Sequence, residues 1–256
     1  MLVLSFDVVL LGLLGKRADV GYYTAAYRVC FLVLGIQVAL YAAYLAAAAR
    51  ADGPAALGRV VSRSLALASA VSLPILVGGF LVAEPLMTLL FGPAFAVGAP
   101  LLRWLLVSIS FALGHEAFSG ALLASGATRR ELAITGTAAA VNVSANLLVI
   151  PAYGASGAAM VTAATEGMAL LLFISAGRQA RWGVRVGGIV PSLAATAIMA
   201  GALLLVGSGP HVLIRIGMAA AVYVVALLAI GVPPEAQPFV TAAKRAIWSA
   251  VHRRPA

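Results

Sequence analysis

The sequence predicts an all-α protein that crosses a membrane several times. Of its 256 residues, 63% are hydrophobic and 10% are charged, and the mean hydropathy is +1.06. Soluble domains carry roughly 25% charged residues. Apolar runs of about 18 residues or more recur along the chain, and each is long enough to cross a hydrocarbon core as a helix. These observations exclude a soluble globular domain.

Eight apolar segments, separated by glycine, proline and basic residues, are expected to form the helices. They lie at residues 2–14, 20–49, 56–82, 97–124, 129–150, 155–177, 187–206 and 212–230. A further apolar piece at 84–91 is too short to span, so we expect it to lie at the interface as a separate element. Pro151 and Gly154 end the fifth segment and predict a tight hairpin with the sixth.

The basic residues predict the orientation of these helices, because cytoplasmic loops carry an excess of Lys and Arg. Counted loop by loop, 12 of the 17 cationic residues fall on one side and 3 on the other, with Arg28 and Arg103 inside spans. Both ends of the chain are therefore expected in the cytoplasm. The net charge of +9 is then a topology signal, and no nucleic-acid partner is expected.

The two ends of the chain carry further expectations. About 14 residues precede the turn at Gly15, and they would extend only roughly 21 Å as a helix. We therefore expect the chain to be part of a longer protein or to begin at a wrongly chosen start codon. Residues 232–256 are expected to form an amphipathic helix on the cytoplasmic face, the alternative being a frayed, solvated tail.

Charged residues inside membrane spans are costly and often functional, so they are the first candidate sites. Asp7 and Arg28 are equally far from the turn between the first two segments. Antiparallel packing of these segments predicts a buried ion pair between them. Such a pair either staples the two helices together or holds Arg28 toward an anionic substrate.

A second group of polar residues lies in the fifth and sixth segments. Asn142 and Asn146 share one helix face, and Thr162 and Glu166 share another at nearly the same depth. They predict either a seam of interhelical hydrogen bonds or a site for a coupling proton or cation centred on Glu166.

Other polar residues give weaker signals. His115 and Glu116 are expected either to line an inner vestibule or to extend toward the lipid headgroups. The same two alternatives apply to Arg103, near the outer end of its helix. The three histidines are scattered without ligand spacing, so no metal site is expected. Gly15 and Lys16 lack the rest of a Walker motif, which argues against ATP. There is no nucleophile motif, so we expect neither an enzyme nor a cofactor.

Several short motifs follow one another along the chain in a recognisable order. The opening hairpin reads Asp7-Val-Val-Leu-Leu-Gly12 and then Val20-Gly21-Tyr22-Tyr23-Thr-Ala-Ala26-Tyr27-Arg28. Leu90-Phe91-Gly92-Pro93-Ala94-Phe95 follows, then the Gly126 turn, and then Asn142-x-x-x-Asn146 running through Ile150-Pro151-x-Tyr153-Gly154-x-x-Gly157-Ala158-Ala159 to Glu166. Together they resemble the C-terminal portion of polysaccharide flippases in the multidrug/oligosaccharidyl-lipid/polysaccharide exporter superfamily.

The resemblance implies a MATE-like architecture of two six-helix lobes around a central cavity. On that scheme residues 1–177 form the second lobe, with its first helix truncated, and residues 187–231 form two additional transmembrane helices. The missing N-terminal lobe would come from the same chain or a separate one. Half a transporter is expected to lack a complete path.

The resemblance also implies a function. Such proteins flip undecaprenyl-diphosphate-linked oligosaccharide across the bacterial cytoplasmic (inner) membrane, for O-antigen, lipopolysaccharide or related polysaccharides. Arg28 is then the best candidate diphosphate contact and Arg103 the second, with Asp7 orienting Arg28 and Glu166 a coupling-ion site. The alternatives are a multidrug or cation antiporter, a lipid II flippase of the same superfamily, or an inactive truncated half.

Overall fold

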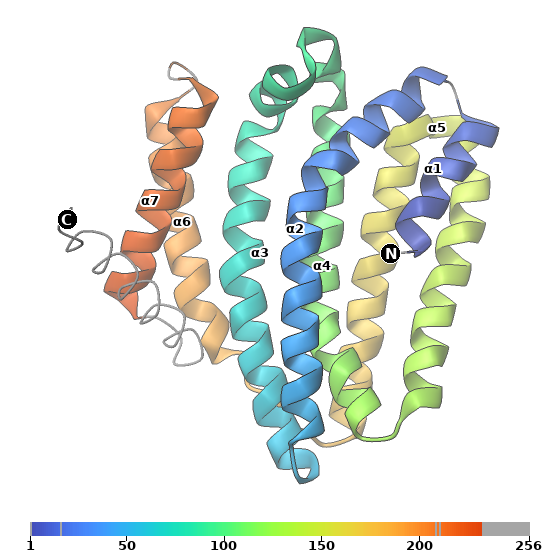
Figure 1. The fold of residues 1–256 in the computed structure, drawn as a ribbon, viewed down its shortest axis with the longest axis vertical. Helices are drawn as coiled ribbons and strands as arrows, with labels where there is room; N and C mark the ends of the chain where they lie inside the picture. Colours follow the sequence, from blue (N-terminus) through green and yellow to red (C-terminus); the bar gives the residue numbers. More distant parts are fainter. Residues whose placement is uncertain (1, 16, 208, 210, 232–256) are drawn as a thin grey trace, which may run out of the picture.

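The computed structural model describes residues 2–15, 17–207, 209 and 211–231, and this part of the chain is helical without any strand (Figure 1). The expected amphipathic tail at 232–256 lies outside the described residues. The α-helices are α1 (Leu2–Leu14), α2 (Arg17–Ala49), α3 (Gly53–Phe91), α4 (Ala99–Ala124), α5 (Thr128–Gln179), α6 (Val190–Val206) and α7 (Val212–Ile230). Two short 3₁₀ helices, η1 (Pro93–Gly98) and η2 (Gly187–Ile189), precede α4 and α6.

The expected class, an all-α polytopic membrane protein, is confirmed. Within the described residues, five helical stretches are long and apolar enough to cross a membrane, and α2 is a sixth if its two parts, bent by 46°, count as one span. The number eight is reached only when α5 is divided into two and α1 is included. With 13 residues, α1 is shorter than a membrane span, as its sequence indicated.

The expected hairpin between the fifth and sixth segments is present as a sharp break inside α5. Gly154 at the break has φ 55° and ψ −140°, a backbone conformation that favours glycine. A Cβ atom there would also collide with the Asp19 carboxylate. The two halves of α5 therefore run antiparallel, one on each side of Gly154 (Figure 1).

The separate interfacial element expected at 84–91 is wrong. These residues continue α3 without interruption, and Pro85 lies inside the helix. Proline is tolerated in membrane helices, where neighbouring groups satisfy the freed carbonyl. The helix ends instead at Gly92, which has φ 96° and donates its backbone N–H to the Thr88 carbonyl.

The connections gather at two ends of the bundle. The α2–α3, α4–α5 and α5–α6 connections share one end, which we call the basic end (Figure 1). It carries Arg50, Arg59, Arg63, Arg129, Arg130, Arg178, Arg181 and Arg185. The α1–α2 turn, η1, the Gly154 break and the α6–α7 connection lie at the opposite end.

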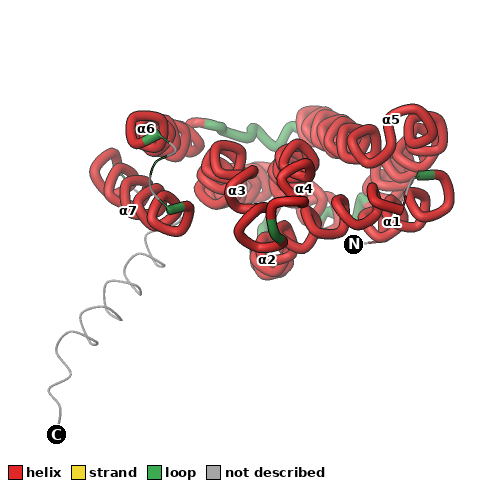
Figure 2. The backbone as a smooth tube through the Cα atoms, turned by 90° about the horizontal axis from the view of Figure 1, so that it is seen from above, coloured by secondary structure: helices red, strands yellow, loops and turns green. Residues whose placement is uncertain are grey.

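The core is built around α4. This helix packs against α2, α3 and α5, and many of its buried side chains are leucines and alanines. The α6–α7 pair forms a smaller apolar cluster of its own and packs against α3 at the edge of the molecule (Figure 2). Helix α1 packs on α5 near the other edge, which brings its one charged residue into the bundle.

Candidate functional site

Asp7 lies at the centre of a buried polar network. Its side chain is fully buried and accepts three hydrogen bonds. The Tyr23 hydroxyl donates over 3.1 Å, the Asn146 amide over 2.9 Å and the Thr162 hydroxyl over 2.7 Å. One carboxylate thus joins α1, α2 and both halves of α5.

The hairpin in α5 explains why these residues meet. Asn146 and Thr162 each lie eight residues from Gly154, on opposite sides of the break. In an antiparallel pair of helices, residues equally far from the turn have the same depth. Helix α1 packs along α5 and places Asp7 at that depth.

The network continues toward the basic end. The Asn146 amide also donates to Asn142 Oδ1 over 3.1 Å, and the Asn142 amide donates to Thr165 Oγ1 over 3.0 Å. We call Asp7, Tyr23, Asn142, Asn146, Thr162 and Thr165 the polar seam. All six side chains are buried, and Asn146 Oδ1 has no hydrogen-bond partner within the described structure.

The polar seam concentrates oxygen atoms around a buried carboxylate. Carboxylate, hydroxyl and amide oxygens are the ligands that hard cations prefer. Among the described residues no cationic side chain bonds to Asp7, so its charge is compensated only by neutral donors. A buried carboxylate at membrane depth without a cationic partner is a candidate functional residue. No group of three or more His, Cys, Asp or Glu side chains suited to a metal ion occurs in the described part.

The expected ion pair between Asp7 and Arg28 is wrong. Tyr23 faces Asp7, and Arg28 follows it by five residues, which is about 140° further around the helix. The Arg28 side chain is accordingly exposed. The expectation rested on equal sequence distance from the turn and did not include the direction of Arg28 around α2.

Glu166 belongs to a different network from the other three predicted residues of the seam. Its carboxylate lies 2.7 Å from His115 Nε2 on α4, and the His115 ring stacks on Phe173 at 5.2 Å. The adjacent Glu116 accepts a hydrogen bond of 2.7 Å from Gln37 on α2. This second network is half-buried and ties α4 to both α2 and α5.

Arg103 lies in neither network. Its Nε donates to the Phe80 carbonyl over 3.2 Å, and its guanidinium lies over the Phe80 ring at 5.1 Å. It lines a cavity of about 600 Å³ with Glu84 and Arg215, near the opposite end of α3. The structure therefore does not bring Arg103 together with Arg28.

An apolar groove has Val29, the residue after Arg28, in its wall, and we call it the groove beside Arg28. Val29 and Val33 of α2 line it together with residues of α3, α4, α6 and α7, and its volume is about 360 Å³. The lining is almost entirely aliphatic, apart from Tyr223. Arg28 precedes Val29 in the sequence but does not itself line the groove, because consecutive residues of a helix point about 100° apart.

Sequence reasoning missed three partners of these networks. Tyr23 and Thr165 belong to the polar seam, and Gln37 belongs to the second network. Thr165 lies three residues from Thr162, so helical spacing was a usable signal. Nothing comparable marked Tyr23 or Gln37, because their partners come from other helices.

Two comparisons with known proteins gave matches, one to a sequence family and one to a solved fold. Residues 1–100 match the family model described as "Polysaccharide biosynthesis protein". The fold is similar to that of "Lipid II flippase MurJ, inward closed conformation", with a TM-score of 0.76 and 15% sequence identity. That alignment covers 88% of this chain and 50% of the flippase, so the chain spans about half its length. The search of curated proteins gave no match. The two matches support the resemblance to a polysaccharide flippase of the exporter superfamily.

Proposed function

We propose that this chain is one lobe of a flippase that moves a polyprenyl-diphosphate-linked oligosaccharide across the bacterial inner membrane for O-antigen or related polysaccharide export. The observation that carries the proposal is the exposed Arg28 inside a membrane span. Arg28 has no ion-pair partner among the described residues, and charged side chains within membrane spans usually face the bundle interior or a water-filled cavity. The family match over residues 1–100 includes this helix.

The chemistry around Arg28 suits both parts of such a substrate. A guanidinium binds diphosphate oxygens through short, charge-assisted and often bidentate hydrogen bonds. The apolar groove at Val29 and Val33 supplies a place for the prenyl chain. Arg28 lies on the same helix as Val29 and Val33 but on a different face, so a long, flexible prenyl-diphosphate must pass around α2 to use both.

A second lobe completes the translocation path in this proposal. The chain aligns with half of a flippase structure, and transporters of this kind place the substrate between two repeats. The partner lobe is carried either by the same polypeptide or by a separate one. Arg28 then faces the cavity between the lobes.

The polar seam supplies the coupling site. We place a proton or small cation at Asp7, with the Thr162 hydroxyl and the unpartnered Asn146 Oδ1 as further oxygen ligands. Binding there would tighten α1 against α5, because the ligands come from both helices. Glu166 serves as a second proton acceptor through its contact with His115.

Replacement of Arg28 tests the function. In a strain whose glycan export depends on this gene, Arg28→Ala should reduce surface polysaccharide at least about tenfold, because the diphosphate loses its charge-assisted contacts. Arg28→Lys should keep part of the activity. The measurement is surface glycan, normalised to the amount of tagged protein on an immunoblot, which also reports whether the 26.0 kDa chain occurs alone or within a longer product.

Arg59→Ala is the matched control, since Arg59 is an exposed arginine at the basic end that does not line the groove. Full export by Arg28→Ala at normal protein levels would contradict the proposal.

Flipping of lipid II is the second candidate, favoured by the similarity to the lipid II flippase fold. Its substrate has the same polyprenyl-diphosphate chemistry, so Arg28 and the groove would serve it equally. Rescue of cells depleted of their lipid II flippase would select this candidate. Loss of surface glycan without a growth defect would select oligosaccharide export.

A further inference from the structure

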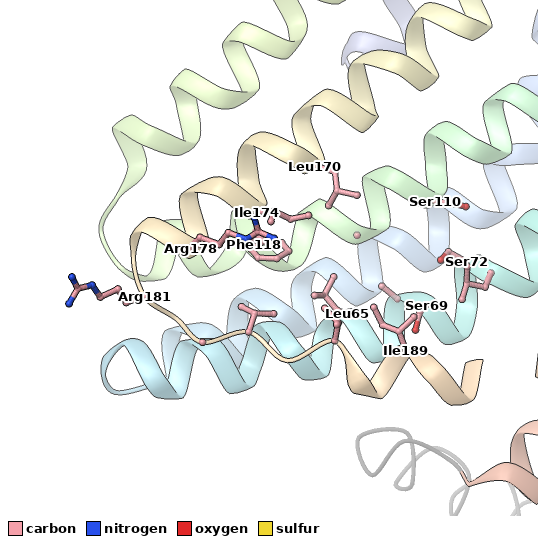
Figure 3. Close-up of a pocket in the computed structure, with 17 residues that line it drawn as sticks. Leu65, Ser69, Ser72, Ser110, Phe118, Leu170, Ile174, Arg178, Arg181 and Ile189 are labelled. Carbon is pink, nitrogen blue, oxygen red and sulfur yellow. The ribbon is translucent and has the colours of Figure 1, made fainter. Parts of the chain in front are cut away.

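A second cavity lies at the basic end, between α3, α4, α5 and the connection at residues 180–189 (Figure 3). Its volume is about 720 Å³, within the range of roughly 300–1,000 Å³ typical of small-molecule sites. Its lining shares no residue with the groove beside Arg28. On α3 the cavity ends at Leu73, whereas the groove begins at Pro74 and continues toward the opposite end.

Small residues on three helices create this space. Ser69 and Ser72 on α3 face Ser110 and Gly114 on α4, and Gly177 lies on α5. Ser69 donates its hydroxyl to the Ala66 carbonyl and Ser110 donates to the Leu106 carbonyl, each over 2.8 Å. Their hydroxyl protons are therefore used within their own helices, and the remaining walls are mostly aliphatic.

The connection that covers the cavity is held in place. The Arg185 backbone N–H donates to Ser62 Oγ over 2.8 Å, and the Trp182 ring stacks on Phe118 at 6.4 Å. Gly58 on α3 lies directly beneath the Trp182 carbonyl, where a Cβ atom would clash. These contacts keep the connection from collapsing into the cavity.

Two arginines lie at the end of this mostly apolar site. Arg178 and Arg181 line it and both are exposed, and the Arg181 guanidinium extends away from the cavity in Figure 3. Arg181 has a positive φ of 56°, which is unusual for a residue other than glycine. No aspartate or glutamate is found among the described residues that line the cavity. Its electrostatic preference is therefore for an anion.

We propose that this cavity binds an anionic glycerophospholipid from the leaflet at the basic end. One acyl chain lies between α3, α4 and α5 against Leu65, Leu170 and Ile174, and the phosphate contacts Arg178 and, once its exposed side chain turns toward the cavity, Arg181. An arginine-rich interfacial end next to a hydrocarbon-lined cavity matches the two parts of a phospholipid. The site holds a structural or regulatory lipid, separate from the translocated substrate.

Lipid retention by the purified full chain tests this proposal. The protein is extracted from nanodiscs that contain phosphatidylglycerol and phosphatidylcholine, and bound lipid is counted by native mass spectrometry. We expect one retained phosphatidylglycerol and no retained phosphatidylcholine. The double variant Arg178→Gln with Arg181→Gln should lower retention at least about tenfold, because two charge-assisted contacts are lost.

Two further variants separate the cavity from general surface charge. Arg59→Gln with Arg129→Gln removes two exposed arginines of the same end that do not line the cavity, and it should retain the lipid. Gly114→Leu should expel the lipid by filling the cavity, whereas Gly114→Ala should be neutral, since its Cβ would lie 3.5 Å from Leu170.

Three results would overturn the proposal. One is equal loss of lipid in the Arg59 and Arg129 control, and another is full retention after Gly114→Leu. The third is a density map of the same protein in which a prenyl phosphate, or residues 232–256 of the chain itself, occupies the cavity.

Discussion

Asp7 shows how one buried charge organises several helices. Its three hydrogen-bond donors come from α2 and from both halves of α5, and none of them is charged. A carboxylate in this setting accepts bonds that a neutral amide cannot all accept. The residue therefore contributes both to the attachment of α1 and to the proposed binding of a cation.

Asp7→Asn should destabilise the protein by about 1–3 kcal/mol, because an asparagine amide group cannot accept from all three donors and a buried donor is left unsatisfied. It should also remove any increase in thermal stability that sodium or acid pH gives the parent protein. The measurement is the melting temperature in detergent, with and without sodium, at two pH values.

Asp52→Asn is the matched control, because Asp52 is exposed and makes no side-chain cap bond at the start of α3. Unchanged stability and an unchanged sodium response in Asp7→Asn would contradict a cation role for the polar seam.

Residue patterns predicted depth better than direction. Asn142, Asn146 and Thr162 meet because their spacing set both their helix face and their distance from Gly154. Asp7 and Arg28 are equally far from their turn in the sequence, but the direction of Arg28 around α2 depends on the rotation of that helix against α1. That rotation is set by packing of large side chains such as Tyr23, which a pairwise depth argument does not contain.

At the scale of elements, one glycine sets the geometry of the site. The break at Gly154 turns α5 back on itself and aligns the two halves that supply Asn146 and Thr162. The sequence predicted this turn because proline and glycine stand together there. It did not predict the continuation of α3 through Pro85, since the helix there is maintained by its surroundings rather than by local propensity.

Gly154→Ala should destabilise the protein by about 1–3 kcal/mol, because alanine resists a positive φ and its Cβ would meet the Asp19 carboxylate. Export should fall together with stability, since the misaligned halves no longer present Asn146 and Thr162 to Asp7. Thermal unfolding and export assays measure the two effects.

Gly136→Ala provides the comparison, as Gly136 lies in the same helix with nothing within 4 Å of its added Cβ. It should be neutral or slightly stabilising, by about 0.5–1 kcal/mol. Equal effects of the two substitutions would mean that the break does not depend on the conformation of Gly154.

At the scale of the whole molecule, charge and hydrophobicity divide the bundle along its axis. The described arginines of the α2–α3, α4–α5 and α5–α6 regions gather at one end, as the counting of loops predicted from the sequence. Both proposed lipid sites follow this division. The cavity at Arg178 lies at the basic end, and the groove beside Arg28 lies farther from it along α3.

The basic end should face the cytoplasm, because basic loops are retained on that side. The chain has one native cysteine, Cys30, which is fully buried, so labelling of the parent by a membrane-impermeant maleimide should be low. Ser125→Cys, an exposed position at the basic end, should be labelled only after the membrane is permeabilised. Ala94→Cys, an exposed position on η1 at the opposite end, should be labelled in intact cells.

The reverse labelling pattern would mean that the protein has the opposite orientation in the membrane, and both proposals would have to change accordingly. The cavity at Arg178 and Arg181 would then open to the outer leaflet, a difference that nanodiscs with the same lipids in both leaflets do not reveal. The proposed oligosaccharide path would also run in the opposite sense relative to Arg28. Agreement of the two cysteines with the expected pattern therefore fixes the leaflet from which the anionic phospholipid comes.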